Sequence, residues 1–242
     1  MSHGGLVAVL VVAAACAGGQ DDSGGGTATS ASGPGGGTSG STTTTAPPVT
    51  PTEPAPTFSA RVGAVTAADL HASWRPGCPL SVERLRAVDA SFWGFDGQVH
   101  EGRIVVADDV VDDVVGVLAD LFTARYPIER MEPVDVYGGS ADASVDANNT
   151  SAFNCRRATG GSSWSQHAYG RAVDLNPLLN PYVDGDTVLP PQSERYLDRS
   201  STDQGVIHDG DPAVVAFESR GWVWGGRWRT LKDYQHFSRT GR

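Results

Sequence analysis

Two short stretches of the sequence contain residue types that could bind and use a metal ion. Residues 164–177 read W-S-Q-H-A-Y-G-R-A-V-D-L-N-P and include His167 and Asp174, and residues 232–237 read K-D-Y-Q-H-F and include His236. Imidazole nitrogens and carboxylate oxygens both bind Zn²⁺, with bonds of about 2.0–2.2 Å. Two histidines and one carboxylate leave a fourth coordination position for water, which is typical of a catalytic zinc site.

Asp233 precedes His236 by three residues and is the candidate general base. A carboxylate beside the open position can accept a proton from a water molecule there. Residues three apart on one regular strand face opposite sides, so we expect Asp233 in a turn before a strand that carries His236. An alternative role for Asp174 is to orient a histidine ligand. Should that set of ligands be wrong, His208 and Asp209 are the spare ligand pair, the next candidates for binding a metal.

Composition and other motifs exclude several function classes. The formal net charge is −10, and Lys232 is the single lysine. Because no basic patch is visible, we expect no nucleic-acid partner. The sequence contains no G-x-S-x-G and no H-E-x-x-H motif, which argues against a serine hydrolase of that type and against a helix-borne zinc site.

The first 57 residues predict export and a tether. A short apolar run at residues 6–15 ends at Cys16, which matches a signal peptide better than a membrane span. Three alanines before Cys16 resemble a bacterial lipobox, which implies cleavage over residues 1–16 and lipid attachment to Cys16. The segment before the apolar run lacks Lys and Arg, and the alternative is a secretion signal without lipidation. Residues 17–57 are rich in Gly, Ser, Thr and Pro, which predicts a disordered tether.

Residues 58–242 are long enough to form one folded domain with its own core. Its two cysteines, Cys78 and Cys155, favour a disulfide in an exported protein; the alternative is two unpaired thiols. The patterns of apolar, capping and turn residues predict three helices and several strands. Helices are expected from Ser81 to about Ala90, from Asp108 to before Pro127, and from Asp211 to Gly221. Strands are expected at residues 104–106, 134–136, 171–176 and 234–237, with a turn at residues 95–97.

The two metal-binding stretches resemble motifs of peptidase family M15. This family comprises zinc D-alanyl-D-alanine carboxypeptidases, including VanY-like enzymes, and phage L-alanyl-D-glutamate endopeptidases. S-Q-H-A-Y-G-R-A-V-D (residues 165–174) resembles its S-x-H-x-x-G-x-A-x-D motif, and D-Y-Q-H-F (residues 233–237) resembles its second motif. N-T-S-A-F-N-C-R-R (residues 149–157) and R-G-W-V-W-G-G (residues 220–226) are also similar, so the resemblance covers roughly residues 60–242.

The resemblance implies a role for each motif residue. His167, Asp174 and His236 would hold Zn²⁺. Asp233 would act first as general base and then as general acid toward the leaving amine.

Further residues of the same motifs would bind the substrate. Arg156 would stabilise the oxyanion or hold a substrate carboxylate, and Arg157 is its rival for this role. Ser165 would line the substrate cleft. The implied fold is α+β, a small, mostly antiparallel sheet with flanking helices, and the implied substrate is the peptide stem of peptidoglycan.

We therefore predict a monomeric zinc metallopeptidase that faces the cell wall from a lipid anchor on Cys16. D,D-carboxypeptidase and L-Ala–D-Glu-type endopeptidase activities compete, and an aspartate at position 233 favours the endopeptidase. The alternative is a non-catalytic cell-wall-binding lipoprotein that retains a structural zinc site.

Overall fold

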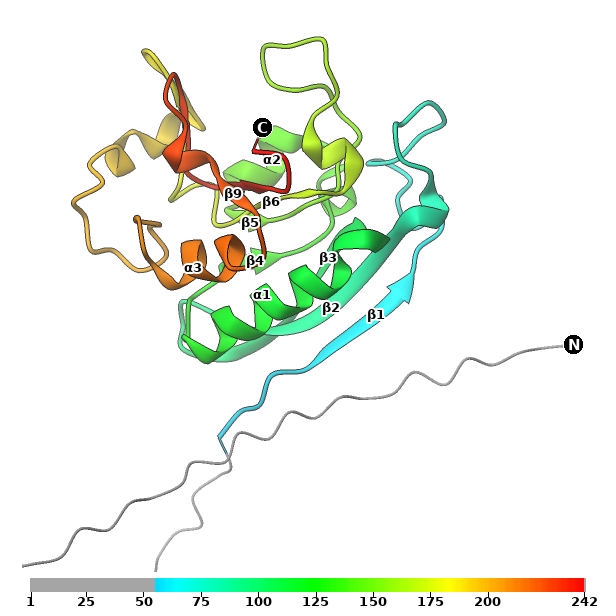
Figure 1. The fold of residues 1–242 in the computed structure, drawn as a ribbon, viewed down its shortest axis with the longest axis horizontal. Helices are drawn as coiled ribbons and strands as arrows, with labels where there is room; N and C mark the ends of the chain where they lie inside the picture. The colour runs from blue at the N-terminus through cyan, green and yellow to red at the C-terminus, as the bar shows by residue number, and fades with distance from the viewer. Residues whose placement is uncertain (1–54, 242) are drawn as a thin grey trace, which may run out of the picture. The chain divides into compact units, whose positions relative to one another are not determined.

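A computed structural model describes residues 55–241 of the chain (Figure 1). The expected signal peptide, Cys16 and the tether up to residue 54 lie outside the described residues. Within residues 55–241, helices and small, mostly antiparallel sheets form an α+β fold. None of the described helices is long and apolar enough to cross a membrane.

The largest sheet contains three antiparallel strands in sequence order: β1 (Ala60–Ala64), β2 (Leu85–Trp93) and β3 (Val99–Ala107). β2 and β3 form a hairpin around the expected turn at residues 95–97, where the Gly94 N–H donates to the carbonyl of Gln98 at 2.8 Å. Both faces of β2 carry buried side chains, because Val88 packs in the main core and Leu85 in a smaller one on the other side.

The helix expected from Ser81 to about Ala90 is wrong. Only the 3₁₀ turn η1 (Val82–Arg84) is helical, and the chain then continues as β2. β2 is the central strand of its sheet, and Val88 lies directly opposite both Val62 of β1 and Ile104 of β3. Pairing on both sides outweighs the helix-like spacing of the apolar residues, because it supplies backbone partners and cross-strand packing together.

The strand expected at residues 134–136 is also wrong. This segment is the 3₁₀ helix η3 (Val134–Tyr137), which ends at Gly138 in the left-handed conformation (φ 63°). Val134 is buried, whereas Val136 is 63% exposed. The two valines therefore do not share the single buried face that their alternation suggested.

The helix expected after residue 108 is confirmed as α1 (Val111–Thr123), preceded by the 3₁₀ turn η2 (Asp108–Val110). Its apolar side packs against β2 and against α3 (Pro212–Glu218), as Figure 1 shows. Asp211 and Gly221 bracket α3 as expected. Val215 points outward with 56% exposure and does not join the core.

The C-terminal half forms three small sheets. β6, β9 and β11 pair antiparallel in the order β6-β11-β9, β10 joins the β7–β8 hairpin, and β4 and β5 are parallel. Their bounds are β4 Arg130–Met131, β5 Asn149–Thr150, β6 Ala172–Asp174, β7 Tyr182–Asp184, β8 Thr187–Leu189, β9 Val223–Trp224, β10 Lys232–Asp233 and β11 His236–Ser238. Four short helices complete the order: α2 Ala141–Asp146, η4 Gln166–Tyr169, η5 Pro191–Tyr196 and η6 Gly225–Arg227.

The segment 151–155 connects the N-terminal sheet to β6. The Phe153 N–H donates to the carbonyl of Val105 in β3, and Ser151 exchanges two backbone hydrogen bonds with Asp174. Cys155 ends this segment and forms a disulfide with Cys78, with 5.8 Å between the Cα atoms. The segment is therefore fixed at both ends, by sheet pairing and by a covalent bond.

We expect the double substitution Cys78→Ala with Cys155→Ala to destabilise the domain by about 2–4 kcal/mol, because the disulfide closes a long loop of the unfolded chain. The two cysteines are 77 residues apart. Urea denaturation with and without reductant measures the effect. Reductant should destabilise the wild type and leave the double variant unchanged; equal stability of the oxidised wild type and the variant would contradict this expectation.

Candidate metal centre

Strand pairing places two of the three candidate metal ligands side by side. β6 and β11 pair antiparallel, with His236 directly opposite Asp174. Side chains at directly opposite positions of an antiparallel pair lie on the same face, with Cβ atoms about 4.5–5.5 Å apart. The register of this strand pair therefore sets the distance between the imidazole and the carboxylate.

The third candidate ligand, His167, comes from η4, just before β6. The Ser165 hydroxyl stands at the N-cap of η4 and accepts a hydrogen bond from the His167 N–H at 3.3 Å. Gly170 ends η4 with a left-handed φ of 63°. A Cβ at Gly170 would lie 2.6 Å from the backbone nitrogen of Ala107, so a glycine is required where the chain turns from η4 into β6.

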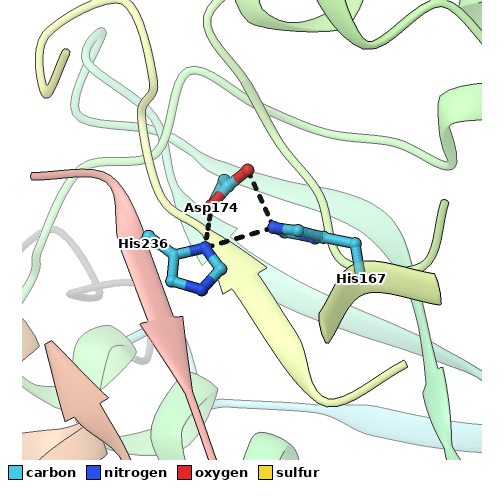
Figure 2. Close-up of side chains that lie close together, drawn as sticks. All are labelled: His167, Asp174 and His236. Atoms are coloured by element: carbon cyan, nitrogen blue, oxygen red, sulfur yellow. Dashed lines mark hydrogen bonds and ion pairs between the residues drawn. The ribbon is translucent and has the colours of Figure 1, made fainter. Parts of the chain in front are cut away.

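The three side chains converge on one point (Figure 2). His236 Nδ1 lies 3.0 Å from Asp174 Oδ1, His167 Nε2 lies 3.1 Å from Asp174 Oδ2, and the two imidazole nitrogens are 3.2 Å apart. All three residues are buried. Ligand atoms bonded tetrahedrally to one ion at about 2.1 Å are roughly 3.4 Å apart, so the separation of the two imidazole nitrogens, and of each nitrogen from its nearest Asp174 oxygen, is close to what a zinc ion requires.

The hydrogen bond at Nδ1 of His167 identifies Nε2 as the nitrogen that can bind a metal ion at this point. Its Nδ1 lies 2.5 Å from the carbonyl oxygen of Ala152, which can only accept a hydrogen bond. Nδ1 therefore carries a proton, and in the metal-binding form of the ring Nε2 would offer its lone pair to an ion at this point. A histidine ligand held by its second nitrogen to a backbone carbonyl is the usual arrangement in metal sites. The residues present thus fit a zinc ion.

Asp174 is held in its ionised form. Burial raises the pKa of Asp174, but the charges and hydrogen bonds of His167 and His236 outweigh burial and hold this pKa well below its usual range. Two nitrogen donors and an ionised carboxylate in a buried space form an electron-rich cluster. A divalent cation would neutralise the carboxylate and satisfy all three groups at once.

Asp233 approaches the cluster from β10, which pairs with β7. The turn expected before β11 comprises residues 234–235, so it follows Asp233 and does not contain it. This turn changes the chain direction between Asp233 and His236. Although the residue as a whole is half-buried, its Oδ1 atom is shielded from solvent and has no hydrogen-bond partner within the described residues.

The surroundings of Asp233 suit a group that exchanges protons near neutral pH. Burial raises the pKa of Asp233 to about 7; the charge of Asp174 adds to this effect, and the charges of His236 and Arg156 oppose it. A carboxylate whose pKa lies near neutrality can both accept and return a proton. A cation held by the three candidate ligands would lower this pKa from its raised value.

The structure separates the two neighbouring arginines. Arg156 is half-buried and its charge acts on Asp233. Arg157 is exposed, donates to the carbonyl of Ser162 and lies over the Trp164 ring, 3.8 Å from its centroid. The geometry therefore favours Arg156 over Arg157 as a residue near the site, although the substrate role of Arg156, like that of Ser165, stays a prediction.

From the sequence, Gln235 has no role in the site, and Trp228 is expected with Trp222 and Trp224 in the core, with one of the three as a candidate wall of the cleft. The Trp228 ring lies against His236, with 5.5 Å between the ring centroids. The Gln235 side chain forms a hydrogen bond that lowers the pKa of Asp233. Gln235 lies within the D-Y-Q-H-F motif, so its proximity could have been anticipated, whereas no sequence signal distinguishes Trp228 from the core tryptophans Trp222 and Trp224.

The spare ligand pair does not form a second metal site. His208 Nδ1 binds Asp211 at 3.0 Å, whereas Asp209 pairs with Arg227. His208 lines a surface hollow of about 390 Å³. None of His167, Asp174, His236 and Asp233 lines this hollow.

Comparison with known families supports the assignment of the site. Residues 159–239 match the family model described as D-alanyl-D-alanine carboxypeptidase. No curated protein and no solved structure matches the chain. The family match confirms the resemblance to peptidase family M15 and spans both His residues of the cluster, Asp174 and Asp233, but not Arg156.

We expect zinc to raise the melting temperature of the chelator-treated domain, because an ion that binds only the folded state stabilises it by about 4 kcal/mol at 1,000 times its Kd. His236→Ala should remove this effect. His208→Ala is the matched control and should retain it. Equal zinc-induced shifts in the wild type and His236→Ala would contradict a site at the cluster. Differential scanning fluorimetry measures the shifts.

Asp233 should make the metal-free protein less stable as the pH rises. Because its pKa is raised to about 7 in the folded state, the stability that its protonated form provides is complete below the unfolded pKa of about 3.9 and is lost as pH rises through 7. We expect Asp233→Asn to melt several degrees above the wild type at pH 8 in chelator and close to it at pH 4, near the unfolded pKa.

The control for this comparison is Asp184→Asn, which removes the same charge from an exposed position on β7. Its melting temperature should differ from that of the wild type by the same small amount at both pH values. A pH-independent difference for Asp233→Asn would show that Asp233 is not held by burial in the way described.

Proposed function

We propose that this protein is a zinc-dependent peptidase that hydrolyses D-alanine-containing stem peptides of peptidoglycan. The observation that carries the proposal is the convergence of His167, Asp174 and His236 on one point, with Asp233 beside them, inside the segment that matches the family model. Substrate class comes from the family description, whereas zinc as the metal comes from the donor set and its dimensions.

The chemistry of peptide hydrolysis assigns a task to each group. When bound, zinc lowers the pKa of a coordinated water to about 7 and withdraws electron density from the substrate carbonyl. Asp233 accepts a proton from the attacking water at its carboxylate and returns it to the leaving amine nitrogen. Burial raises the pKa of Asp233 and a bound cation would lower it, and a carboxylate balanced between these two effects can both accept and return the proton.

Arg156 supplies positive charge on the side of Asp233. Its planar guanidinium can stabilise a developing oxyanion or form a paired contact with a substrate carboxylate. Peptidoglycan stems carry free carboxylates, so the same residue can contribute to binding.

His167 and Ala152 keep the metal-facing imidazole in one tautomer, so the ring need not reorganise when substrate binds.

The bond that is cut can be one of two. The description of the matched family favours removal of the terminal D-alanine by carboxypeptidase action. An aspartate at position 233 favours the L-Ala–D-Glu-type endopeptidase, as in the branch of the family that the second motif resembles. Both activities use the same four side chains, so the difference lies in how the stem is placed.

We place the domain outside the membrane, lipid-anchored through Cys16 and facing the cell wall. This part of the proposal rests on the sequence of residues 1–57, in which an apolar run, a lipobox-like cysteine and a Gly/Ser/Thr/Pro segment follow one another. Such a location would bring the site to its polymeric substrate.

Digestion of purified muropeptides, read by mass spectrometry, tests the function. We expect the zinc-loaded wild type to release either one D-alanine or a whole stem peptide, which also identifies the bond. Asp233→Ala should lose about 10²–10⁴-fold in kcat while it retains one zinc per chain. Arg156→Ala should also lose activity, whereas Arg157→Ala, its neighbour and matched control, should remain close to wild type.

Two results would contradict the proposal. A zinc-loaded wild type that binds cell walls but releases neither D-alanine nor a stem peptide would identify the protein as a non-catalytic wall-binding lipoprotein. Full activity of Asp233→Ala would exclude Asp233 as the base.

A further inference from the structure

The R-G-W-V-W-G-G motif at residues 220–226 has no role in the chemistry described above. In the structure it runs through β9 into the start of η6. β9 pairs with β11, the strand that carries His236, and η6 lies beside β10, the strand that carries Asp233. The motif therefore touches both ends of the turn between the candidate base and the last candidate ligand.

Gly225 contacts the backbone of Asp233 more closely than any side chain would allow. A Cβ placed on Gly225 would lie 2.5 Å from the carbonyl oxygen of Asp233, 3.0 Å from its Cβ and 3.3 Å from its carbonyl carbon. Gly225 is not among the residues with positive φ, so the glycine is required by space and not by its own backbone conformation. Only the hydrogen atom of a glycine fits between the Cα of Gly225 and the backbone of Asp233.

Two hydrogen bonds hold this contact closed. Trp224 Nε1 donates to the carbonyl of Tyr234 at 2.8 Å, which holds the peptide group between Tyr234 and Gln235, one residue after Asp233. Lys232 Nζ donates to the carbonyl of Gly226 at 3.0 Å, which fixes the residue before Asp233. The residues on both sides of Asp233 are thus hydrogen-bonded to the segment Trp224–Gly226, Lys232 through its side chain and Tyr234 through its carbonyl.

The side chain of Asp233 has few other constraints. Its Oδ1 has no partner within the described residues, and Gln235 is the one side chain whose hydrogen bond acts on its pKa. The position of the carboxylate is therefore set mainly by the position of the Asp233 backbone. Whatever moves that backbone moves the base.

We propose that Gly225 is a positioning residue for Asp233, and that the Trp224–Gly226 segment sets the distance between this base and the metal centre. The inference rests on the proposed function, since it assigns Gly225 a role only if Asp233 acts on the water that attacks the substrate. A methyl group at position 225 must displace the Asp233 backbone, because the atoms it would meet are backbone atoms and the Asp233 Cβ, which cannot rotate away. A displacement approaching 1 Å at a catalytic group can cost about 10²-fold in rate.

The test is a double-mutant cycle on zinc-loaded protein, with kcat and KM measured on purified stem pentapeptide ending in D-alanyl-D-alanine and on muropeptides. We expect Gly225→Ala to lower kcat by about 10²-fold, to leave KM within a few-fold, and to retain one zinc per chain. In an Asp233→Asn background the same substitution should have almost no further effect, because the group that it displaces no longer acts as a base.

Gly161→Ala is the matched control, because a Cβ there meets no atom closer than 3.8 Å, and its activity should equal that of the wild type. Should Gly225→Ala not fold, Lys232→Met provides the second test. It removes the ammonium group that donates to the carbonyl of Gly226 and keeps a side chain of similar length at this half-buried position. We expect a several-fold loss of kcat that again disappears in the Asp233→Asn background.

The outcomes separate this inference from the proposed function. An inactive zinc-loaded wild type would overturn the proposed function itself. An active wild type with an equally active Gly225→Ala would overturn the positioning role alone. A loss of kcat that persists unchanged in the Asp233→Asn background would also overturn it, because the defect would then be general and not transmitted through Asp233.

Discussion

The metal centre depends on the antiparallel pairing of β6 with β11, which sets Asp174 directly opposite His236. Side chains alternate between the two faces of a strand. If the pairing register shifted by one residue, one of these side chains would lie on the other face and the cluster would be lost. The fold protects this register from several directions. β9 pairs with the other edge of β11, Ser151 pairs with Asp174, and the buried Phe237 ring stacks on Phe217 of α3.

The same cluster is a poor way to stabilise a protein. A buried carboxylate and two imidazoles have to be desolvated, and His236 Nε2 and Asp233 Oδ1 find no partner among the described residues. Groups of this kind cost free energy unless something compensates them. Both unpartnered atoms lie on the short segment from Asp233 to His236, as expected of a site that serves function and not stability. A bound cation fits the donor set and would compensate for the cost of burying these groups.

The site could be predicted from sequence more fully than the scaffold. His167, Asp174 and His236 could be grouped because their motifs carry chemical information that does not depend on the secondary structure around them. Residues 82–90 could not be placed, because their apolar spacing fits a helix turn or a strand, and only the pairing partners at β1 and β3 decide between them. The contact of Gly225 with Asp233 also lies beyond sequence reasoning, because it depends on two segments that meet only after β9 and β10 have each found their partners.

X-ray absorption spectroscopy of the zinc-loaded protein tests the central claim most directly, since it reports the atoms bound to the ion without reference to activity. With one zinc per chain, the spectrum should show two imidazole nitrogens and oxygen ligands at about 2.0–2.2 Å and no sulfur. A protein that binds no stoichiometric zinc, or a spectrum with fewer than two imidazole ligands, would contradict the proposal that these three side chains form a metal centre.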